Sequence, residues 1–286
     1  MNQKIRSLIE KELGKINRIT PVGGGDISTA YRITTARHDF FVKVNHGSDA
    51  SGMFEAERAG LELIRNTGAI RTPEVINLDH FEDGAFLILE NIQSKSPSGE
   101  DLRNFGIQLA HLHQKSFENY GGNAANFIGS LPQPNEWSDD WPDFYMVCRL
   151  LPQLNMAAER KFLQRKEIPE KAVILESIRP FLSSPHPSLI HGDLWGGNFL
   201  IDTEGDPVLI DPAVYYGHHQ VDIAMSKLFG GFGREFYNAY YAEMGCAEIS
   251  QAETDLYQLY YLLVHLNLFG SSYYFPVKKI MDRYFS

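Results

Sequence analysis

Apolar and polar positions alternate along the first third of the chain in a way that predicts a β-sheet. Five segments have this strand-like pattern: residues 16–25, 26–35, 38–45, 75–81 and 85–91. Residues 53–68 instead repeat apolar side chains at helical spacing and end at Gly68, a residue typical of helix C-caps. We therefore predict a five-stranded antiparallel sheet with one inserted helix, preceded by an amphipathic helix over residues 1–15.

From residue 92 onward the pattern is mainly helical. Helical spacing covers residues 101–117, 141–163, 170–182 and the region from 220 to the end. Residues 119–136 are rich in Gly, Asn and Pro and should form a long loop, whereas short strand-like runs flank residues 191–198. The predicted class is α+β, with an N-terminal lobe over residues 1–91 and a helical C-terminal lobe over residues 92–286.

Composition narrows the range of partners. The chain has 286 residues with 43% hydrophobic and 22% charged residues, as in ordinary globular proteins. A net charge of −10 argues against non-specific nucleic-acid binding. The only cysteines, Cys148 and Cys246, allow no disulfide framework, which indicates a reducing, cytoplasmic compartment. The apolar run at 256–269 is too short and too polar to span a membrane, so we expect no membrane partner.

The stretch HGDLWGGN, residues 191–198, carries the clearest chemistry. Asp193 and Asn198 are five positions apart, as in a kinase catalytic loop, and Asp211 follows a further apolar run. Phosphoryl transfer needs one carboxylate to accept a hydrogen bond from the attacking hydroxyl. It also needs an amide oxygen and a second carboxylate to hold Mg²⁺. The alternative is structural, with the Asp capping a helix and the Asn in a turn.

A second group of residues lies in the N-terminal half. Lys43 stands in the apolar strand FFVKVN, where a lysine is unfavourable unless it is paired. Glu57 on the following helix is the preferred partner, ahead of Glu55. Three upstream glycines would allow close approach of phosphates: Gly23, Gly24 and Gly25. The alternatives are a lysine at the sheet edge and a flexible glycine hairpin.

Along the chain these features occur in the order required by a eukaryotic-type kinase fold, which is glycine turn, strand lysine, helix glutamate, hinge, catalytic loop and metal-binding aspartate. Together with the segments IDPAVYYGHHQVDIA, FGGF, NFIGSLPQPNEW, DDWPDFY and RLLPQL, they make the chain resemble the fructosamine kinase (ketosamine-3-kinase) family, which is related to aminoglycoside and choline kinases. The resemblance covers nearly the whole chain. It implies a protein-kinase-like fold with two lobes and ATP- and Mg²⁺-dependent phosphorylation of the sugar 3-hydroxyl of ketosamines. These are ribulosamine or fructosamine adducts of amines or protein lysines, and phosphorylation would promote deglycation.

The resemblance also implies roles for single residues. Asp193 resembles the catalytic base and should stay ionised at neutral pH, and Asn198 and Asp211 resemble the Mg²⁺ ligands. The nucleotide-binding positions that it implies are Lys43, Glu57, Glu90, Asn91 and Ile92. Asp222 resembles a helix N-cap that braces the catalytic loop, where His191 should also be a structural hydrogen-bonding residue. Asp26 stands where some members carry a cysteine, so we expect no disulfide switch at this turn.

Aromatic residues are the candidates for contact with the sugar. Trp195 would form a flat wall beside it, and Gly196 and Gly197 would allow the chain to return after Asp193. Three further candidates lie in the segment before the catalytic loop: Trp137, Trp141 and Tyr145. Their helical spacing is equally typical of core packing. For His218 and His219 both substrate contact and solvent exposure stay open.

Two rival functions remain at this point. One is another small-molecule kinase of the same fold, for an aminoglycoside, choline or homoserine, although the sequence Asp211-Pro212-Ala213 differs from their usual pattern. The other is a nucleotide-binding pseudokinase, which the presence of all four polar site residues disfavours. We expect a monomer or weak dimer that acts on a small-molecule or protein-bound ketosamine.

Overall fold

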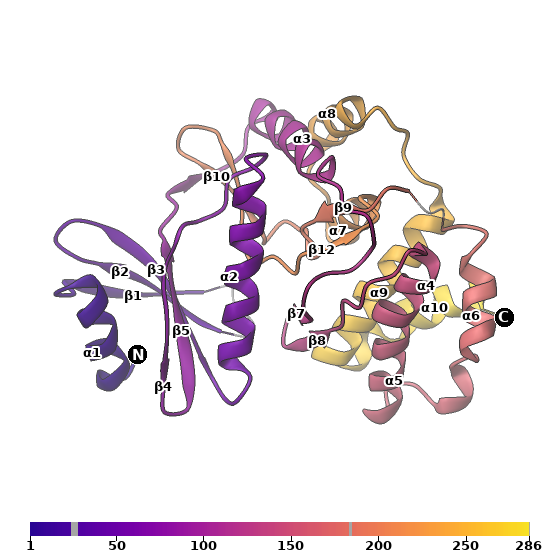
Figure 1. Cartoon of the computed structure of the whole chain (residues 1–286), viewed down its shortest axis with the longest axis horizontal. Coiled ribbons are helices and arrows are strands. Elements are labelled where there is room, and N and C mark those ends of the chain that lie inside the picture. Colours follow the sequence, from indigo (N-terminus) through magenta and orange to yellow (C-terminus); the bar gives the residue numbers. More distant parts are fainter. Residues whose placement is uncertain (24–27, 183–184, 286) are drawn as a thin grey trace.

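The computed structural model describes residues 1–23, 28–182 and 185–285 of the chain. It has two lobes, with the sheet in the N-terminal lobe and most helices in the C-terminal lobe (Figure 1). Of the predicted glycine turn, Gly23 is described, whereas Gly24, Gly25 and Asp26 lie outside the described residues.

The predicted five-stranded sheet is confirmed. Its strands, in spatial order, are β1 (Arg18–Val22), β2 (Thr29–Thr34), β3 (Asp39–His46), β5 (Gly84–Glu90) and β4 (Val75–Phe81). Every neighbouring pair is antiparallel, and the register of β3 and β5 pairs Lys43 with Leu87. The central strands β3 and β5 therefore have partners on both sides, which fits their apolar sequences.

Two helices cover opposite faces of this sheet (Figure 1). Side chains alternate along a strand, so Val42 and Val44 pack with α1 (Gln3–Leu13) on the outer face. Phe41 and Lys43 point to the other face, where α2 (Ala50–Asn66) lies between the sheet and the C-terminal lobe. The strand lysine thus faces the junction of the lobes.

The lobes are joined by the segment after β5. Residues Ser94–Lys95 form a short strand, β6, that pairs with β10 (Phe199–Asp202), which in turn pairs with β11 (Pro207–Leu209). Helix α3 (Gly99–His113) then begins at Ser98, whose side chain and that of Asp101 form a reciprocal capping box. Ser98 is therefore the predicted N-cap, and the proposed boundary at 91/92, between β5 and β6, stays a prediction.

The rest of the C-terminal lobe is mainly helical, as predicted. Its elements are β7 (Asn126–Ile128), β8 (Leu131–Gln133), α4 (Trp141–Tyr145), the π-helix η1 (Met146–Leu150), α5 (Leu151–Glu159), η2 (Arg165–Glu167), α6 (Lys171–Ile178), β9 (Ser188–Ile190), β12 (Tyr215–Gly217), α7 (Gln220–Leu228), α8 (Arg234–Met244), α9 (Gln251–Phe269), η3 (Ser271–Tyr273) and α10 (Tyr274–Tyr284). The core of this lobe forms around the long helix α9.

Two segments differ from the sequence prediction. The expected loop at 119–136 contains the hairpin β7–β8, and the expected helix at 141–163 is interrupted by the π-helix η1 and ends at Glu159. Pro152 lacks the amide hydrogen that a regular α-helix would direct to residue 148, which accounts for the irregular turn before it. Within the described residues, no helix has the length and apolar character needed to cross a membrane.

Candidate active site

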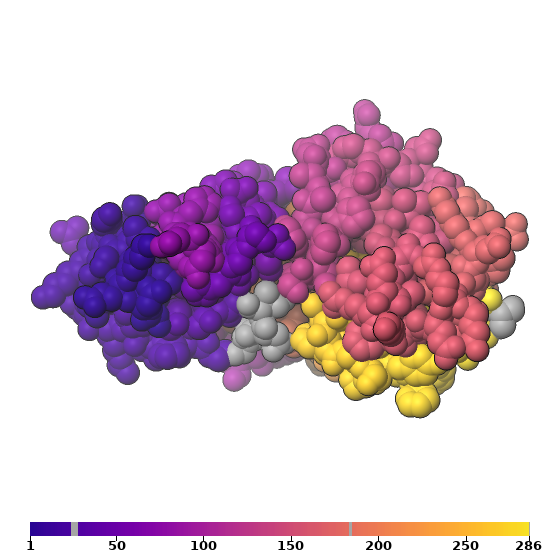
Figure 2. Space-filling view, turned by 90° about the horizontal axis from the view of Figure 1, so that it is seen from below, coloured from indigo at the N-terminus to yellow at the C-terminus, as the bar shows by residue number. Residues whose placement is uncertain are grey.

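A cavity of about 1100 Å³ lies between the lobes, and residues from both line it. Seen from below, the indigo-to-purple N-terminal lobe and the yellow C-terminal helices lie on opposite sides of the molecule's centre (Figure 2). The cavity brings together most of the predicted site residues: Gly23, Lys43, Glu57, Glu90, Asn91, Ile92, Asp193, Trp195, Asn198 and Asp211. Side chains separated by more than 150 positions in the sequence thus share one space.

Lys43 lies in the N-terminal-lobe half of this cavity, between two carboxylates. Its Nζ lies 2.7 Å from Oε1 of Glu57 and 2.6 Å from Oδ1 of Asp211, so the preferred helix partner is the one observed. Burial alone would lower the pKa of Lys43, but the carboxylates of Asp211 and Glu57 outweigh it and raise the pKa above its usual value. Lys43 is therefore a permanent cation in this half of the cavity.

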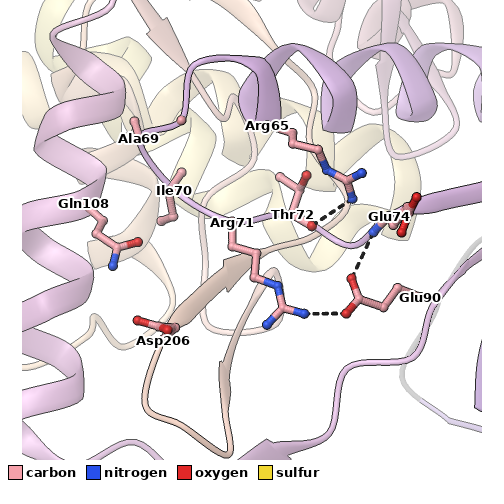
Figure 3. A pocket seen from close by; sticks show the side chains of 10 residues that line it. Arg65, Ala69, Ile70, Arg71, Thr72, Glu74, Glu90, Gln108 and Asp206 are labelled. Carbon is pink, nitrogen blue, oxygen red and sulfur yellow. Dashed lines mark hydrogen bonds and ion pairs between the residues drawn. The ribbon is translucent and has the colours of Figure 1, made fainter.

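The expected hinge runs along the edge of the same cavity. The Glu90 amide donates to the Glu74 carbonyl at 2.8 Å, and the Glu90 carboxylate bonds to the guanidinium of Arg71 (Figure 3). Arg71 also donates to Oδ2 of Asp202 in the C-terminal lobe at 2.7 Å. A second cavity, of about 620 Å³, opens beside this arginine. Arg71, which the sequence reasoning missed, thus connects the two lobes at the hinge.

A buried carboxylate holds the loop at residues 191–198 in place. Asp222 accepts hydrogen bonds from the amides of His191 at 2.7 Å and Gly192 at 2.9 Å, and from Nε2 of His113 at 3.1 Å. Asp222 lies in the first turn of α7, and His219 rather than Asp222 is the N-cap residue. The expected bracing role therefore fits the geometry, but through side-chain bonds to the loop and not through capping.

A glycine with positive φ lies one residue before Asp193. Gly192 has φ of 82°, and a Cβ atom there would lie 2.1 Å from the carbonyl oxygen of Ala213, so a side chain would strain this position. Gly196 and Gly197 are the central residues of a second turn, closed by the Asn198 amide, which donates to the Trp195 carbonyl at 3.0 Å, so the chain returns there as expected. Neither glycine has positive φ. A Cβ at Gly197 would instead meet the Trp195 ring at 2.4 Å. That glycine makes room for the ring.

Asp193 and Asn198 form the polar centre of the loop. The Asn198 side-chain amide donates to the backbone carbonyl of Asp193 at 2.8 Å and to its Oδ2 at 3.0 Å. Burial raises the pKa of Asp193 to about 7; the bond from Asn198 opposes this rise and the charge of Asp211 adds to it. The expectation of a fully ionised carboxylate at neutral pH is therefore replaced by a group that titrates near pH 7.

His191 has the structural role that was expected. Its Nε2 donates to the Ile210 carbonyl at 2.9 Å, and its Nδ1 accepts from the Asp193 amide at 3.2 Å. These two bonds fix the neutral tautomer. Burial lowers the pKa of His191, which also favours the neutral form.

The two predicted metal ligands offer oxygen atoms to the cavity. Because Asn198 directs its nitrogen to Asp193, its carbonyl oxygen is left for another partner. Asp211 adds a carboxylate in a left-handed conformation with φ of 55°. Within the described ranges no group of three His, Cys, Asp or Glu side chains is arranged to hold a metal. This donor set fits Mg²⁺, which commonly takes one or two carboxylates and completes its shell with phosphates and water.

Comparisons with known proteins identify the family of this chain. The family model described as fructosamine kinase matches residues 1–286. The chain belongs to the fructosamine kinase family. A probable ketoamine kinase of Enterococcus faecium is 39% identical over 94% of this chain and 96% of its own length. A chloroplastic protein-ribulosamine 3-kinase of Oryza sativa subsp. indica is 38% identical over 97% of this chain and 81% of its own length.

Solved structures show the same fold. A crystal structure from Haemophilus somnus, named as a fructosamine-3-kinase, superposes with a TM-score of 0.88 at 27% identity and covers 99% of this chain and 97% of its own. Aminoglycoside phosphotransferases share the fold at 15% identity, with TM-scores of 0.59 and 0.62. This member of the fructosamine kinase family is therefore an ATP-dependent kinase with a protein-kinase-like, two-lobe fold.

Three predicted substrate contacts of this fructosamine kinase family member lie away from the cavity. Trp141 is fully buried and donates to the Tyr257 hydroxyl at 3.0 Å, and Tyr145 is buried and donates to the Leu256 carbonyl at 3.0 Å. Trp137 is exposed but stacks on Phe117, with ring centroids 5.0 Å apart. None of the three is among the described residues that line the cavity. Trp141 and Tyr145 are therefore core residues, which was the alternative interpretation of their helical spacing.

His218 and His219 are also placed by the structure. His218 bonds to the Tyr257 hydroxyl and is buried, and Nδ1 of His219 lies 2.8 Å from the Tyr240 hydroxyl. Burial lowers the pKa of both imidazoles, that of His219 to about 3, so both are neutral at physiological pH. Neither is among the described residues of the cavity wall.

The C-terminal-lobe half of the cavity is instead lined by aromatic residues that the sequence reasoning missed. Trp195 lies there as expected, together with Phe229, His265, Phe269 and Tyr273. His265 and Phe269 are one helical turn apart on α9, and both are partly exposed on a helix that is otherwise largely buried. The sequence did offer one signal for this wall, because His265 and Phe269 are aromatic residues at i, i+4 spacing at the end of an apolar helix.

Proposed function

We propose that this kinase transfers the γ-phosphate of ATP to the sugar 3-hydroxyl of ketosamines and prefers ribulosamines to fructosamines. The observation that carries the proposal is the cavity itself. It places the Lys43–Glu57–Asp211 ion-pair group and the Asp193 carboxylate around one space, so a nucleotide and a sugar can meet there. The name of the rice relative, a ribulosamine 3-kinase, supports the choice of acceptor.

The chain's own residues would position the reactants. Asp193 would accept a hydrogen bond from the sugar hydroxyl and direct its oxygen to the γ-phosphorus, taking the proton late because the transition state is loose. Lys43 would hold the nucleotide phosphates, and Glu57 would keep the lysine in place. Asn198 and Asp211 would hold Mg²⁺, which neutralises the developing phosphate charge when bound. Asn91 and Ile92 would present their backbone to adenine, with Glu90 tied to Glu74 and Arg71.

The product explains a role in protein repair. A phosphate at O3 makes the sugar–amine adduct labile, so the amine is released and the adduct is removed. The proposed pathway is therefore deglycation of small-molecule or protein-bound ketosamines.

A panel of ribulosyl-, erythrulosyl- and fructosyl-lysine, read out by ADP release with Mg²⁺, tests this function. We expect the highest kcat/KM on the ribulosyl adduct and no activity without divalent metal. Turnover of an aminoglycoside, choline or homoserine above every ketosamine would favour the rival small-molecule kinases. Nucleotide binding without ADP release on any acceptor would favour a pseudokinase.

We also propose a cytoplasmic monomer or weak dimer with the lobe boundary at 91/92. One chain supplies both halves of the cavity, so catalysis requires no partner subunit. Light scattering across a concentration series measures the oligomeric state. A stable dimer at the concentrations used for activity would contradict this part of the proposal.

A further inference from the structure

Five of the aromatic residues that line the C-terminal-lobe half of the cavity, which is the acceptor half in the proposed function, form one continuous strip. Ring centroids lie 6.4 Å apart between Trp195 and Phe229, 4.7 Å between Phe229 and His265, 5.4 Å between His265 and Phe269, and 5.1 Å between His265 and Tyr273. All five side chains line the cavity. They connect the catalytic loop with the end of α9 and with η3, so the strip leads away from Asp193 toward the rim.

The exposure of these rings is unusual for their size. Trp195 and Phe229 are each 37% exposed and Phe269 is 47% exposed, although burial of such rings is strongly favourable. Other apolar side chains of α9, such as Leu263 and Leu266, are buried in the core. The exposed rings therefore belong to the cavity wall and leave apolar surface for a bound molecule to cover.

The lysine and arginine side chains that line the cavity all come from the N-terminal lobe, as far as the described residues show. The two lining cations, Arg32 and Lys43, stand on strands β2 and β3 of the N-terminal lobe, and each is paired with a carboxylate. In the acceptor half, no lysine or arginine is found among the described lining residues, whereas Asp193 is present. A carboxylate on the acceptor would thus have no lysine or arginine to pair with, and burying it beside Asp193 would be costly.

The chemistry of the acceptor matches this surface. A ketosamine carries a secondary amine that is a cation at neutral pH, bonded on one side to the sugar and on the other to the carrier of the amine. Aromatic faces attract such a cation, and they also pack well with an apolar stem. With the sugar hydroxyl at Asp193, the amine and its carrier would extend over rings that begin at Trp195, two residues along the chain.

We propose that the strip formed by Phe229, His265, Phe269 and Tyr273 is a subsite for the amine carrier and selects carriers with an apolar or aromatic stem over those with a carboxylate near the amine. The inference rests on the proposed function, because it needs the sugar to be placed at Asp193. Lysine side chains within a polypeptide, polyamines and simple alkyl or aryl amines fit this subsite. Adducts on the α-amine of a free amino acid do not.

A matched substrate set tests the selection. It consists of the ribulosyl adducts of benzylamine, of 4-(aminomethyl)benzamide and of 4-(aminomethyl)benzoate, which share the sugar, the amine and the ring. We expect kcat/KM to fall at least about tenfold from the benzylamine adduct to the benzoate, with the amide close to benzylamine, because only the benzoate brings an unpaired charge. Equal kcat/KM within about twofold for all three would overturn the inference, whereas absence of turnover on every ketosamine would overturn the proposed function as well.

Variants of the strip test its residues. Phe269→Ala should raise KM for the benzylamine adduct about three- to tenfold, the effect of one lost ring contact, with kcat and KM for ATP nearly unchanged. Phe275→Ala is the matched control, because Phe275 is 79% exposed on α10 and is not among the described residues of the cavity wall. Phe229→Ala provides a second test from the other end of the strip. If both strip variants behave like Phe275→Ala on all three adducts, the carrier does not bind there.

Discussion

At the level of single residues, Asp193 is the group on which the reaction depends most. Asp193→Asn keeps the shape of the side chain but replaces one acceptor oxygen with a donor, which would misalign the attacking hydroxyl. We expect turnover to fall on the order of 10²–10⁴-fold, with nucleotide affinity nearly unchanged. Steady-state kinetics and nucleotide titration on one preparation measure both. Activity within about threefold of the parent protein would show that the loop at 191–198 is not catalytic.

The environment of Asp193 also predicts the pH dependence. Its pKa is raised to about 7, and only the ionised carboxylate can accept the bond from the hydroxyl. Activity should therefore be present above pH 7 and be lost as the pH falls through about 7, about tenfold per pH unit below it. A pH profile of kcat/KM for the sugar gives the apparent value for the free enzyme. A profile that is flat down to pH 5 would mean that the base titrates far lower.

Lys43 predicts a different kinetic signature. Its Nζ contacts the carboxylates of Glu57 and Asp211, and removing the ammonium leaves both without their cation. Lys43→Ala should lower kcat by about 10²-fold or more and weaken nucleotide binding much less, because the lysine positions phosphates for transfer. An effect confined to KM for ATP would instead indicate a contact made equally in the ground state.

The sequence predicted polar residues of the site better than aromatic ones. An unpaired lysine in an apolar strand is costly, so Lys43 required a partner, and the structure brings it to Glu57. No such requirement for a partner attaches to an aromatic side chain, which can pack in a core or line a cavity that a ligand covers. Trp141 and Phe269 have similar sequence patterns, but the first is fully buried and the second is half exposed. Only the packing of α9 against the other helices decides between them.

At the level of elements, the strands were predictable because β3 and β5 are short apolar runs, and the structure buries residues 42–44 and 85–89 within them. The hairpin β7–β8 was not, because polar side chains hold it: Gln133 donates to the Ala213 carbonyl at 3.2 Å, and Asn126 donates to the Val214 carbonyl at 2.8 Å. Such bonds leave no hydrophobic periodicity in the sequence. They also attach the hairpin to the segment that follows Asp211.

The position of α2 relative to that segment gives a testable prediction. A Cβ at Gly60 would lie 3.1 Å from Cγ of Pro212, so the helix packs closely against the residue next to Asp211. Gly60→Leu should push α2 outward, separate Glu57 from Lys43 and lower kcat, at a cost in stability of about 1–3 kcal/mol. Gly52→Ala on the same helix is the control, because its Cβ meets nothing closer than 3.8 Å. Thermal unfolding and kinetics measure both variants, and parallel behaviour of the two would contradict the packing argument.

At the level of the whole molecule, the orientation of the lobes depends on few contacts at the hinge. Arg71 precedes β4, and its guanidinium joins Glu90 at the end of β5 to Asp202 in β10, while its carbonyl accepts from the Leu209 amide at 2.9 Å. The backbone bond persists in any variant, so the side chain can be removed without separating the segments. The Arg71–Asp202 ion pair is the one that crosses to the C-terminal lobe at this point, and Figure 3 shows the other contact of this arginine, with Glu90.

Arg71→Gln should therefore loosen the hinge without unfolding the protein. Because the guanidinium is partly exposed, its two ion pairs are worth little each, and we expect KM for ATP to rise about two- to fivefold with a small change in kcat. Arg65→Gln is the matched control, because Arg65 lines the same second cavity as Arg71. The described hydrogen bond of its guanidinium stays within the N-terminal lobe, to the Thr72 carbonyl at 3.2 Å. A double-mutant cycle with Asp202→Asn isolates the contact between the lobes. Additive effects of Arg71→Gln and Asp202→Asn on KM for ATP would show that this ion pair does not set the geometry of the nucleotide site.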